Sequence, residues 1–116
     1  MTLKQLLQLI RNQPDSVSFD SCLECINENY QFTATHFTNG ELYNERGQNQ
    51  GSCKIFAFGL INQLTEAQTL ACFGDYYRQD VLQNPHADNH QNIRQFMQTG
   101  WKGIHFDEIP LASVLS

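Results

Sequence analysis

Basic residues are few in this 116-residue sequence: Lys and Arg total 7 against 12 Asp and Glu, which gives a formal net charge of −5. No basic run is present that would neutralise a line of phosphates, so we expect neither nucleic acid nor a membrane surface as a partner. No apolar stretch approaches the ~20 residues that a helix needs to cross a bilayer. The opening segment also lacks the apolar core of a secretory signal, so we expect no export by the general secretory route.

Cysteine is also scarce, with only Cys22, Cys25, Cys53 and Cys72. This density is low for a disulfide scaffold, and reduced thiols in a cytosol are the simpler expectation. Apolar residues nevertheless make up 41% of the chain and aromatic residues 11%. The sequence therefore predicts a compact single domain over residues 1–116 with its own core.

Helical spacing of apolar residues predicts a mainly α fold of about five helices with a small β element. The predicted helices cover residues 3–12, 19–29, 53–64, 66–82 and 89–99. Their predicted N-terminal caps are Thr2, Ser18, Ser52, Thr65 and the pair Asp88 and Gln91. The third helix is apolar on both sides, which is typical of a buried helix. Gly74 is expected to weaken the middle of the fourth helix.

Residues 30–51 show no helical period, and Asn39-Gly40, Gly47 and Gly51 punctuate them. The stretch is expected to contain one short hairpin. A long irregular segment within a compact domain is often functional, which makes the polar loop 36–51 a candidate recognition surface. Ile104 and Phe106 alternate about His105 as in a half-buried strand.

Cys53 is the strongest candidate for catalysis, because the expected cap at Ser52 places its thiol in the first turn of a helix. Such a position lowers the pKa of a thiol, since the exposed N–H groups favour the thiolate. A thiol-dependent hydrolase or acyltransferase with Cys53 as nucleophile is therefore one hypothesis, with His36, His86, His90 or His105 as possible bases. The competing interpretation is that Cys53 is a small core residue.

Cys22 and Cys25 have the C-x-x-C spacing of redox and zinc sites, but they lie on the apolar stripe of a predicted helix. We interpret them as core residues and expect no metal and no cofactor. His90 and Arg94 are four residues apart and can share one helix face. That face either binds an anion or presents a water-facing pair.

Several blocks of the sequence, in order, resemble the HopJ type III effector family. They are Phe37–Glu41, Gly47–Ala57, Thr65–Gly74, Tyr76–Arg78, His90–Arg94 and Gly100-Trp101. The resemblance covers essentially the whole chain and implies a compact fold and a bacterial origin. The family has no established activity, so it supplies no catalytic residues. It implies residence in the bacterial cytoplasm and leaves secretion through a type III system open.

The leading hypothesis from the sequence is a non-enzymatic binding protein whose partner is an unknown protein or small ligand. Its recognition surface would combine the 36–51 loop, the start of the following helix and the His90/Arg94 face. The expected binding residues are Asn39, Glu41, Gln48, Asn49, His90 and Arg94. The Cys53 enzyme is the alternative, and a purely structural role for this surface is a third interpretation.

Overall fold

The computed structural model describes residues 1–114, so the last two residues of the predicted domain lie outside the described range. The α-helices within it are α1 (Leu3–Asn12), α2 (Phe19–Asn29), α3 (Gln50–Ile61), α4 (Glu66–Ala71) and α5 (Gln91–Thr99). Two segments are 3-10 helices, η1 (Pro14–Ser16) and η3 (Gly100–Gly103), and η2 (Tyr76–Val81) is a π-helix. The strands are β1 (Tyr30–Phe32), β2 (Phe37–Asn39), β3 (Leu42–Asn44), β4 (Ile104–Phe106) and β5 (Leu111–Ser113). The prediction of a mainly α fold with a small β element is confirmed.

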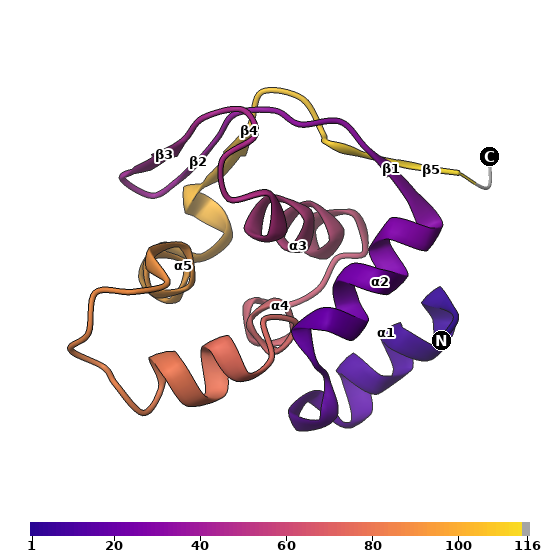
Figure 1. Ribbon diagram of the computed structural model, residues 1–116, viewed down its shortest axis with the longest axis horizontal. Helices are drawn as coiled ribbons and strands as arrows, with labels where there is room; N and C mark the ends of the chain where they lie inside the picture. Colours follow the sequence, from indigo (N-terminus) through magenta and orange to yellow (C-terminus); the bar gives the residue numbers. More distant parts are fainter. Residues whose placement is uncertain (115–116) are drawn as a thin grey trace.

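The strands form two small antiparallel sheets above α3 (Figure 1). The predicted hairpin is β2–β3, and β2 also pairs with β4, so that Phe37 lies opposite Phe106. The predicted strand about His105 is therefore confirmed. The second sheet, β1 with β5, was not predicted. Residues 30–51 are thus largely strands and turns that cover the core.

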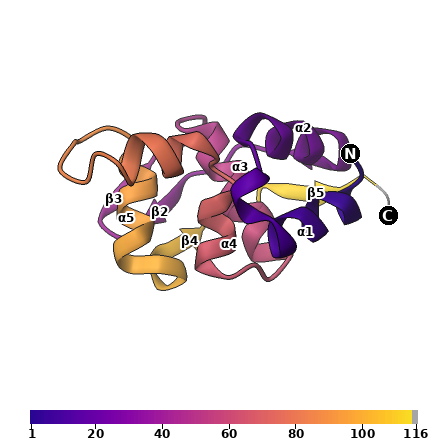
Figure 2. The ribbon, with the colours of Figure 1, turned by 90° about the horizontal axis from the view of Figure 1, so that it is seen from below.

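Helix α3 lies at the centre of the molecule, as its apolar sequence predicted. It packs between α2 and α4 and beneath the strands (Figures 1 and 2). The ring of Phe56 has no exposed surface, and its centroid lies 6.1 Å from that of Phe37, 5.5 Å from Phe73 and 4.9 Å from Phe96. These rings join the strands, the turn after α4 and α5 into one core.

The predicted caps of three helices are confirmed. The side chains of Thr2, Ser18 and Thr65 each accept a hydrogen bond from the backbone N–H three residues later. The fourth predicted helix is not continuous, because α4 ends at Ala71 and the chain turns at Gly74 with φ +60°. A Cβ at Gly74 would lie 2.7 Å from the backbone nitrogen of Phe19. Close contact with the start of α2 therefore requires glycine here.

Two predicted helix starts are wrong. Helix α3 begins at Gln50 with Asn49 as its cap, so Ser52 lies inside the first turn. Helix α5 begins at Gln91 with His90 as its cap, and Asp88 accepts a bond from the Gln91 side chain only through its carbonyl oxygen. Both actual caps have a left-handed backbone with φ 53°. Residue type alone does not reveal such caps, since neither side chain accepts a capping bond.

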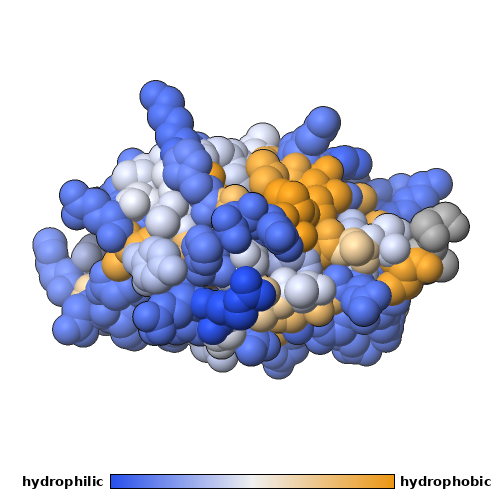
Figure 3. Space-filling view, turned by 90° about the horizontal axis from the view of Figure 1, so that it is seen from above, coloured by the Kyte–Doolittle hydropathy of each residue, from blue (hydrophilic) through white to orange (hydrophobic). Residues whose placement is uncertain are grey.

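No helix in the described part of the chain is long and apolar enough to span a membrane. The face that carries the strands is mostly hydrophilic, with a broad hydrophobic patch right of its middle in the view of Figure 3 and smaller ones elsewhere.

Candidate functional site

A groove of about 460 Å³ opens where α3 and α5 begin. Its lining residues come from α2, the turn after α4, the start of η2 and the starts of α3 and α5: Phe19, Asn49, Gly51, Ser52, Phe73, Tyr76, His90, Gln91, Asn92 and Ile93. None of them carries a carboxylate, although the whole chain has a net charge of −5. The lining of the groove therefore lacks the negative side chains that outnumber the positive ones in the whole chain.

The start of α3 supplies backbone donors to the groove. The first helical N–H groups have no carbonyl one turn earlier to bond to, and in α3 no side chain caps them. Asn49 instead directs its side-chain amide to Asn44 Oδ1 at 2.7 Å. Because Gly51 and Ser52 line the groove, the positive end of the α3 dipole faces it.

The start of α5 supplies a histidine that is held from two sides. His90 Nε2 lies 2.9 Å from Asp80 Oδ2, and the His90 ring lies 5.0 Å from that of Tyr76. Asp80 and Tyr76 both belong to the π-helix η2. Wide helical turns of this kind are often found at functional sites. The left-handed backbone at His90 is a second local irregularity in the same place.

Aromatic rings form one wall of the groove and contact both helix starts. The Phe19 ring contacts Tyr76 edge to face with a centroid distance of 5.1 Å, and it stacks on Phe73 at 6.2 Å. A Cβ at Gly51 would lie 2.9 Å from Phe19 Cζ, so glycine lets the ring approach α3. A flat or apolar ligand group can contact this wall.

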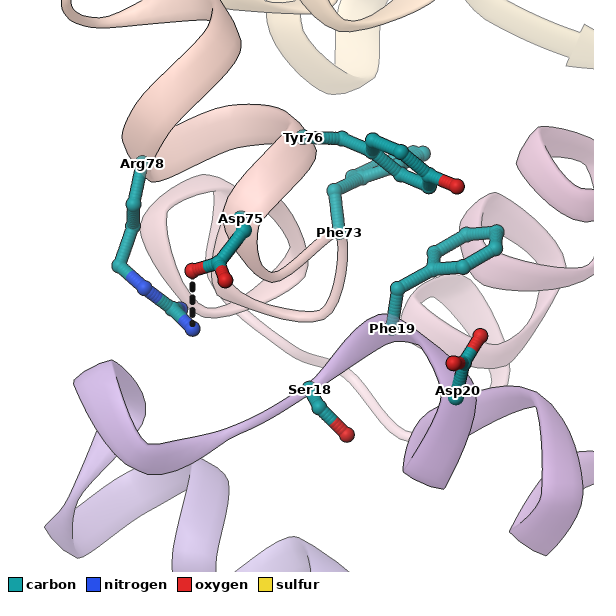
Figure 4. Close-up of a pocket in the computed structure, with 7 residues that line it drawn as sticks. All are labelled: Ser18, Phe19, Asp20, Phe73, Asp75, Tyr76 and Arg78. Carbon is teal, nitrogen blue, oxygen red and sulfur yellow. Dashed lines mark ion pairs between the residues drawn. The ribbon is translucent and has the colours of Figure 1, made fainter.

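The same wall borders a smaller pocket of about 180 Å³, shown in Figure 4. Asp20 and Asp75 line it together with Arg78. Asp75 lies 3.8 Å from the Arg78 guanidinium, and Asp20 lies in the first turn of α2, where a negative charge offsets the helix dipole. Its charges are therefore largely balanced within the protein.

A buried cluster of asparagines holds together the segments that line the groove. Asn39 Nδ2 donates to the backbone oxygen and to Oδ1 of Asn92, at 2.8 and 3.0 Å. Asn44 and Asn92 exchange two amide bonds, at 3.1 and 2.9 Å. Asn49 joins the cluster through Asn44. The β2–β3 hairpin is thereby tied to the starts of both α3 and α5.

The six predicted binding residues do not form one surface. Asn49 and His90 line the groove, whereas Asn39 is fully buried beneath it. Glu41 and Gln48 are exposed on turns outside the lining. Arg94 donates to backbone oxygens of residues 84 and 89 and lines a separate groove beside η2. The guanidinium of Arg94 thus holds the loop before α5.

Cys53 does not have the properties expected of a nucleophile. Its side chain is 1% exposed, and its N–H bonds to Asn49 O at 3.0 Å within the helix. Burial raises the pKa of the Cys53 thiol to about 11, although Lys54 acts in the opposite direction. The expectation of a lowered pKa was therefore wrong. The thiol belongs to the core.

The remaining cysteines also lie in the core. Cys22, Cys25 and Cys72 are at most 2% exposed, and all four cysteines are unpaired. Burial and the neighbouring Cys22 raise the pKa of Cys25. The interpretation of Cys22 and Cys25 as core residues is confirmed. Within residues 1–114, no group of three or more His, Cys, Asp or Glu side chains is arranged to hold a metal ion.

Four contributors to the site were missed by sequence reasoning. Asn92 has no distinguishing spacing, and Asp80 meets His90 only because of the π-helical turn. Ser52 was assigned to a cap and is instead a lining residue. Tyr76 lines the groove and was not among the expected binding residues. The sequence signal that was available is that Ser52, Tyr76 and Asn92 all lie in blocks that resemble the family.

The fold and the site define a small, mainly α protein with one aromatic-walled groove between two helix starts. The chain belongs to the family described as HopJ type III effector protein, which matches residues 3–111. It is also similar to a protein of unknown function, VPA0580, whose crystal structure superposes with a TM-score of 0.96 at 49% sequence identity. That match covers 97% of this chain and 94% of the other. No curated protein matches the chain.

Proposed function

We propose that this chain is a binding protein whose ligand lies in the groove between the starts of α3 and α5. The carrying observation is that two helices begin at one cavity that no carboxylate lines. Helix starts favour negative groups, and the aromatic wall favours a flat or apolar body. The ligand class we infer is therefore a small organic anion with an aromatic or apolar part.

Two further observations support this proposal. Three of the blocks that resemble the family, which contain Ser52, Tyr76 and Asn92, meet at the groove although they are far apart in the sequence. The asparagine cluster also holds both helix starts in place before any ligand arrives. A preformed site loses less conformational freedom on binding.

Residence in the bacterial cytoplasm is part of the proposal. Four unpaired cysteines support a reducing compartment. Delivery through a type III system remains compatible with it, since the family description names that route.

The proposal is tested by titrating the 15N-labelled protein with phenylacetate and recording amide chemical shifts. A ligand of this size is expected to bind with a Kd of about 1 mM. The largest shifts are expected at Gly51, Ser52 and Asn92, and the uncharged analogue 2-phenylethanol should bind more weakly. Shifts spread evenly over the surface, or equal affinity for the two compounds, would contradict the proposal.

The chain offers a matched pair of variants for this test. Tyr76 and Tyr43 are both exposed tyrosines, at 44% and 59%, but only Tyr76 lines the groove. Tyr76→Ala should weaken phenylacetate binding, while Tyr43→Ala should leave it unchanged. Equal effects of the two substitutions on binding would contradict a contact between the ligand and the aromatic wall.

A further inference from the structure

A negative charge lies next to the groove although no carboxylate lines it. Asp80 is not a lining residue, but its Oδ2 lies 2.9 Å from Nε2 of His90, which is one. The side chain of His90 is 26% exposed and that of Asp80 is 46% exposed. An anion in the groove that approaches His90 therefore also approaches a carboxylate.

The imidazole of His90 is held by two contacts that persist when its charge changes. An ionised carboxylate only accepts hydrogen bonds, so Nε2 donates to Asp80 Oδ2 in both the neutral and the protonated ring. The His90 ring also lies 5.0 Å from the ring of Tyr76, with an interplanar angle of 34°. An aromatic neighbour at this distance suits a neutral ring and also attracts a cationic one. The ring can therefore keep its position in both charge states.

The other charged and titratable groups around His90 come from η2, α5 and the loop before α5. Asp80 and Tyr76 contact the ring from η2, and Arg94 donates to the backbone oxygen of Asp80 at 3.5 Å. No titratable side chain of α2 or α3 lines the groove. Among the side chains in contact with this pair, histidine is the type that ordinarily changes charge between pH 5 and 8. The exposed loop before α5 adds two groups outside the groove lining, His86 and Asp88.

We propose that His90 is a charge switch for the groove: protonation of its ring neutralises the pair with Asp80 and strengthens the binding of an anion. At high pH the pair carries one negative charge, which repels an anion in the groove. At low pH the pair is neutral overall, and the repulsion is removed. This inference rests on the proposed function, because it names what regulates the same site.

The size of the effect follows from the separation of the charges. The hydrogen bond between His90 and Asp80 is 2.9 Å long. A ligand carboxylate that contacts the far edge of the His90 ring then lies on the order of 6–8 Å from the Asp80 carboxylate. At this separation in a partly exposed site, removal of one negative charge strengthens anion binding by about three- to tenfold. The affinity of the groove for an organic anion therefore falls as the pH rises.

The test is the phenylacetate titration of the unaltered protein, repeated at about pH 5.5 and at about pH 7.5. The carboxyl group of the ligand is ionised at both values, so a change in affinity belongs to the protein. We expect the Kd to be about three- to tenfold lower at the lower pH. The uncharged 2-phenylethanol should bind equally at both. An unchanged Kd for phenylacetate, or the same change for 2-phenylethanol, overturns the inference.

His90→Asn and His36→Asn form a matched pair for this test. Asn tolerates the left-handed backbone at position 90. His36 also lies beside a carboxylate and a tyrosine ring, Asp107 at 3.9 Å and Tyr43 at 5.7 Å, but it does not line the groove. His90→Asn should abolish the pH dependence of phenylacetate binding, and His36→Asn should preserve it. A pH dependence that survives in His90→Asn belongs to another group and overturns the inference.

Asp80→Asn tests whether the ligand is repelled by this carboxylate. The substitution should strengthen phenylacetate binding at about pH 7.5 by about three- to tenfold. Asp15→Asn makes the same charge change at an exposed position on η1 outside the groove, and it should leave the Kd unchanged. The same gain in both variants would be a general effect of net charge and would contradict the role of Asp80.

Failure of this inference and failure of the proposed function give different results. Phenylacetate that binds in the groove with one affinity at both pH values refutes only the charge switch. No binding in the groove at either pH refutes both. The titrations of the unaltered protein do not depend on whether any variant folds.

Discussion

Gly74→Ala is expected to destabilise the protein strongly, for two reasons that the structure separates. The residue has φ +60°, and a left-handed backbone costs a residue with a side chain about 1–2 kcal/mol. In addition, the new Cβ would lie 2.7 Å from the Phe19 backbone nitrogen and 3.3 Å from Ser18 Cα. Backbone atoms at the start of α2 cannot move aside as the end of a long side chain can. The total expected loss of unfolding free energy is about 3 kcal/mol.

Gly47→Ala is the matched control for the conformational part. Gly47 has φ +84°, but a Cβ there would meet only Gln50 Nε2, at 3.9 Å. Its expected loss is therefore about 1–2 kcal/mol. Urea unfolding of both variants followed by circular dichroism measures the difference, provided that the m-values agree. Equal losses in the two variants would refute the argument that close packing on α2 requires glycine at position 74.

Two further predictions concern the buried polar and thiol groups. Asn92→Ala should lower the unfolding free energy by about 2–4 kcal/mol, because the buried amide groups of Asn39 and Asn44 lose their bonds to the Asn92 side chain, although Asn39 Nδ2 keeps its bond to the backbone oxygen of residue 92. Asn27→Ala, which removes an exposed bond to Lys54, should cost under about 1 kcal/mol in the same urea assay; similar costs would contradict the cluster's role. At pH 8 the thiolate fraction of Cys53 is expected to be about 100-fold lower than that of an ordinary thiol, because its pKa is raised to about 11. Alkylation with iodoacetamide should be correspondingly slow until urea unfolds the protein, and rapid alkylation of folded Cys53 would contradict its burial. Since the folded pKa lies above the unfolded one, the stability that neutral Cys53 contributes is complete below its ordinary pKa and is lost as the pH rises through about 11.

The parts of the fold that were predictable depend on local chemistry. Thr2 and Thr65 are followed three residues later by a glutamine, and both capping boxes form. The apolar residues on both sides of α3 specify burial wherever its neighbours lie. For the fourth helix, the sequence predicted a weak point at Gly74 but not a break. The cause of the break is the close contact of Gly74 with the backbone at the start of α2, which the sequence does not reveal.

The site was less predictable because tertiary contacts set both helix starts. Ser52 is a good capping residue, yet α3 begins earlier, where Asn49 bonds to Asn44 in the hairpin. His90 becomes a cap because Asp80, from a different segment, binds its ring. Sequence spacing placed His90 and Arg94 on one face, and the structure directs them to different cavities.

The asparagine cluster gives the hairpin an indirect part in any function of the groove. Asn39 and Asn44 do not touch the cavity, but Asn92, which does, bonds to both. Asn39 Oδ1 has no hydrogen-bond partner among the described residues, so the cluster is not fully satisfied. A buried polar network of this kind costs more than an apolar contact of the same shape. Its position directly behind two irregular helix starts indicates that it serves to hold the geometry of the groove rather than to maximise stability.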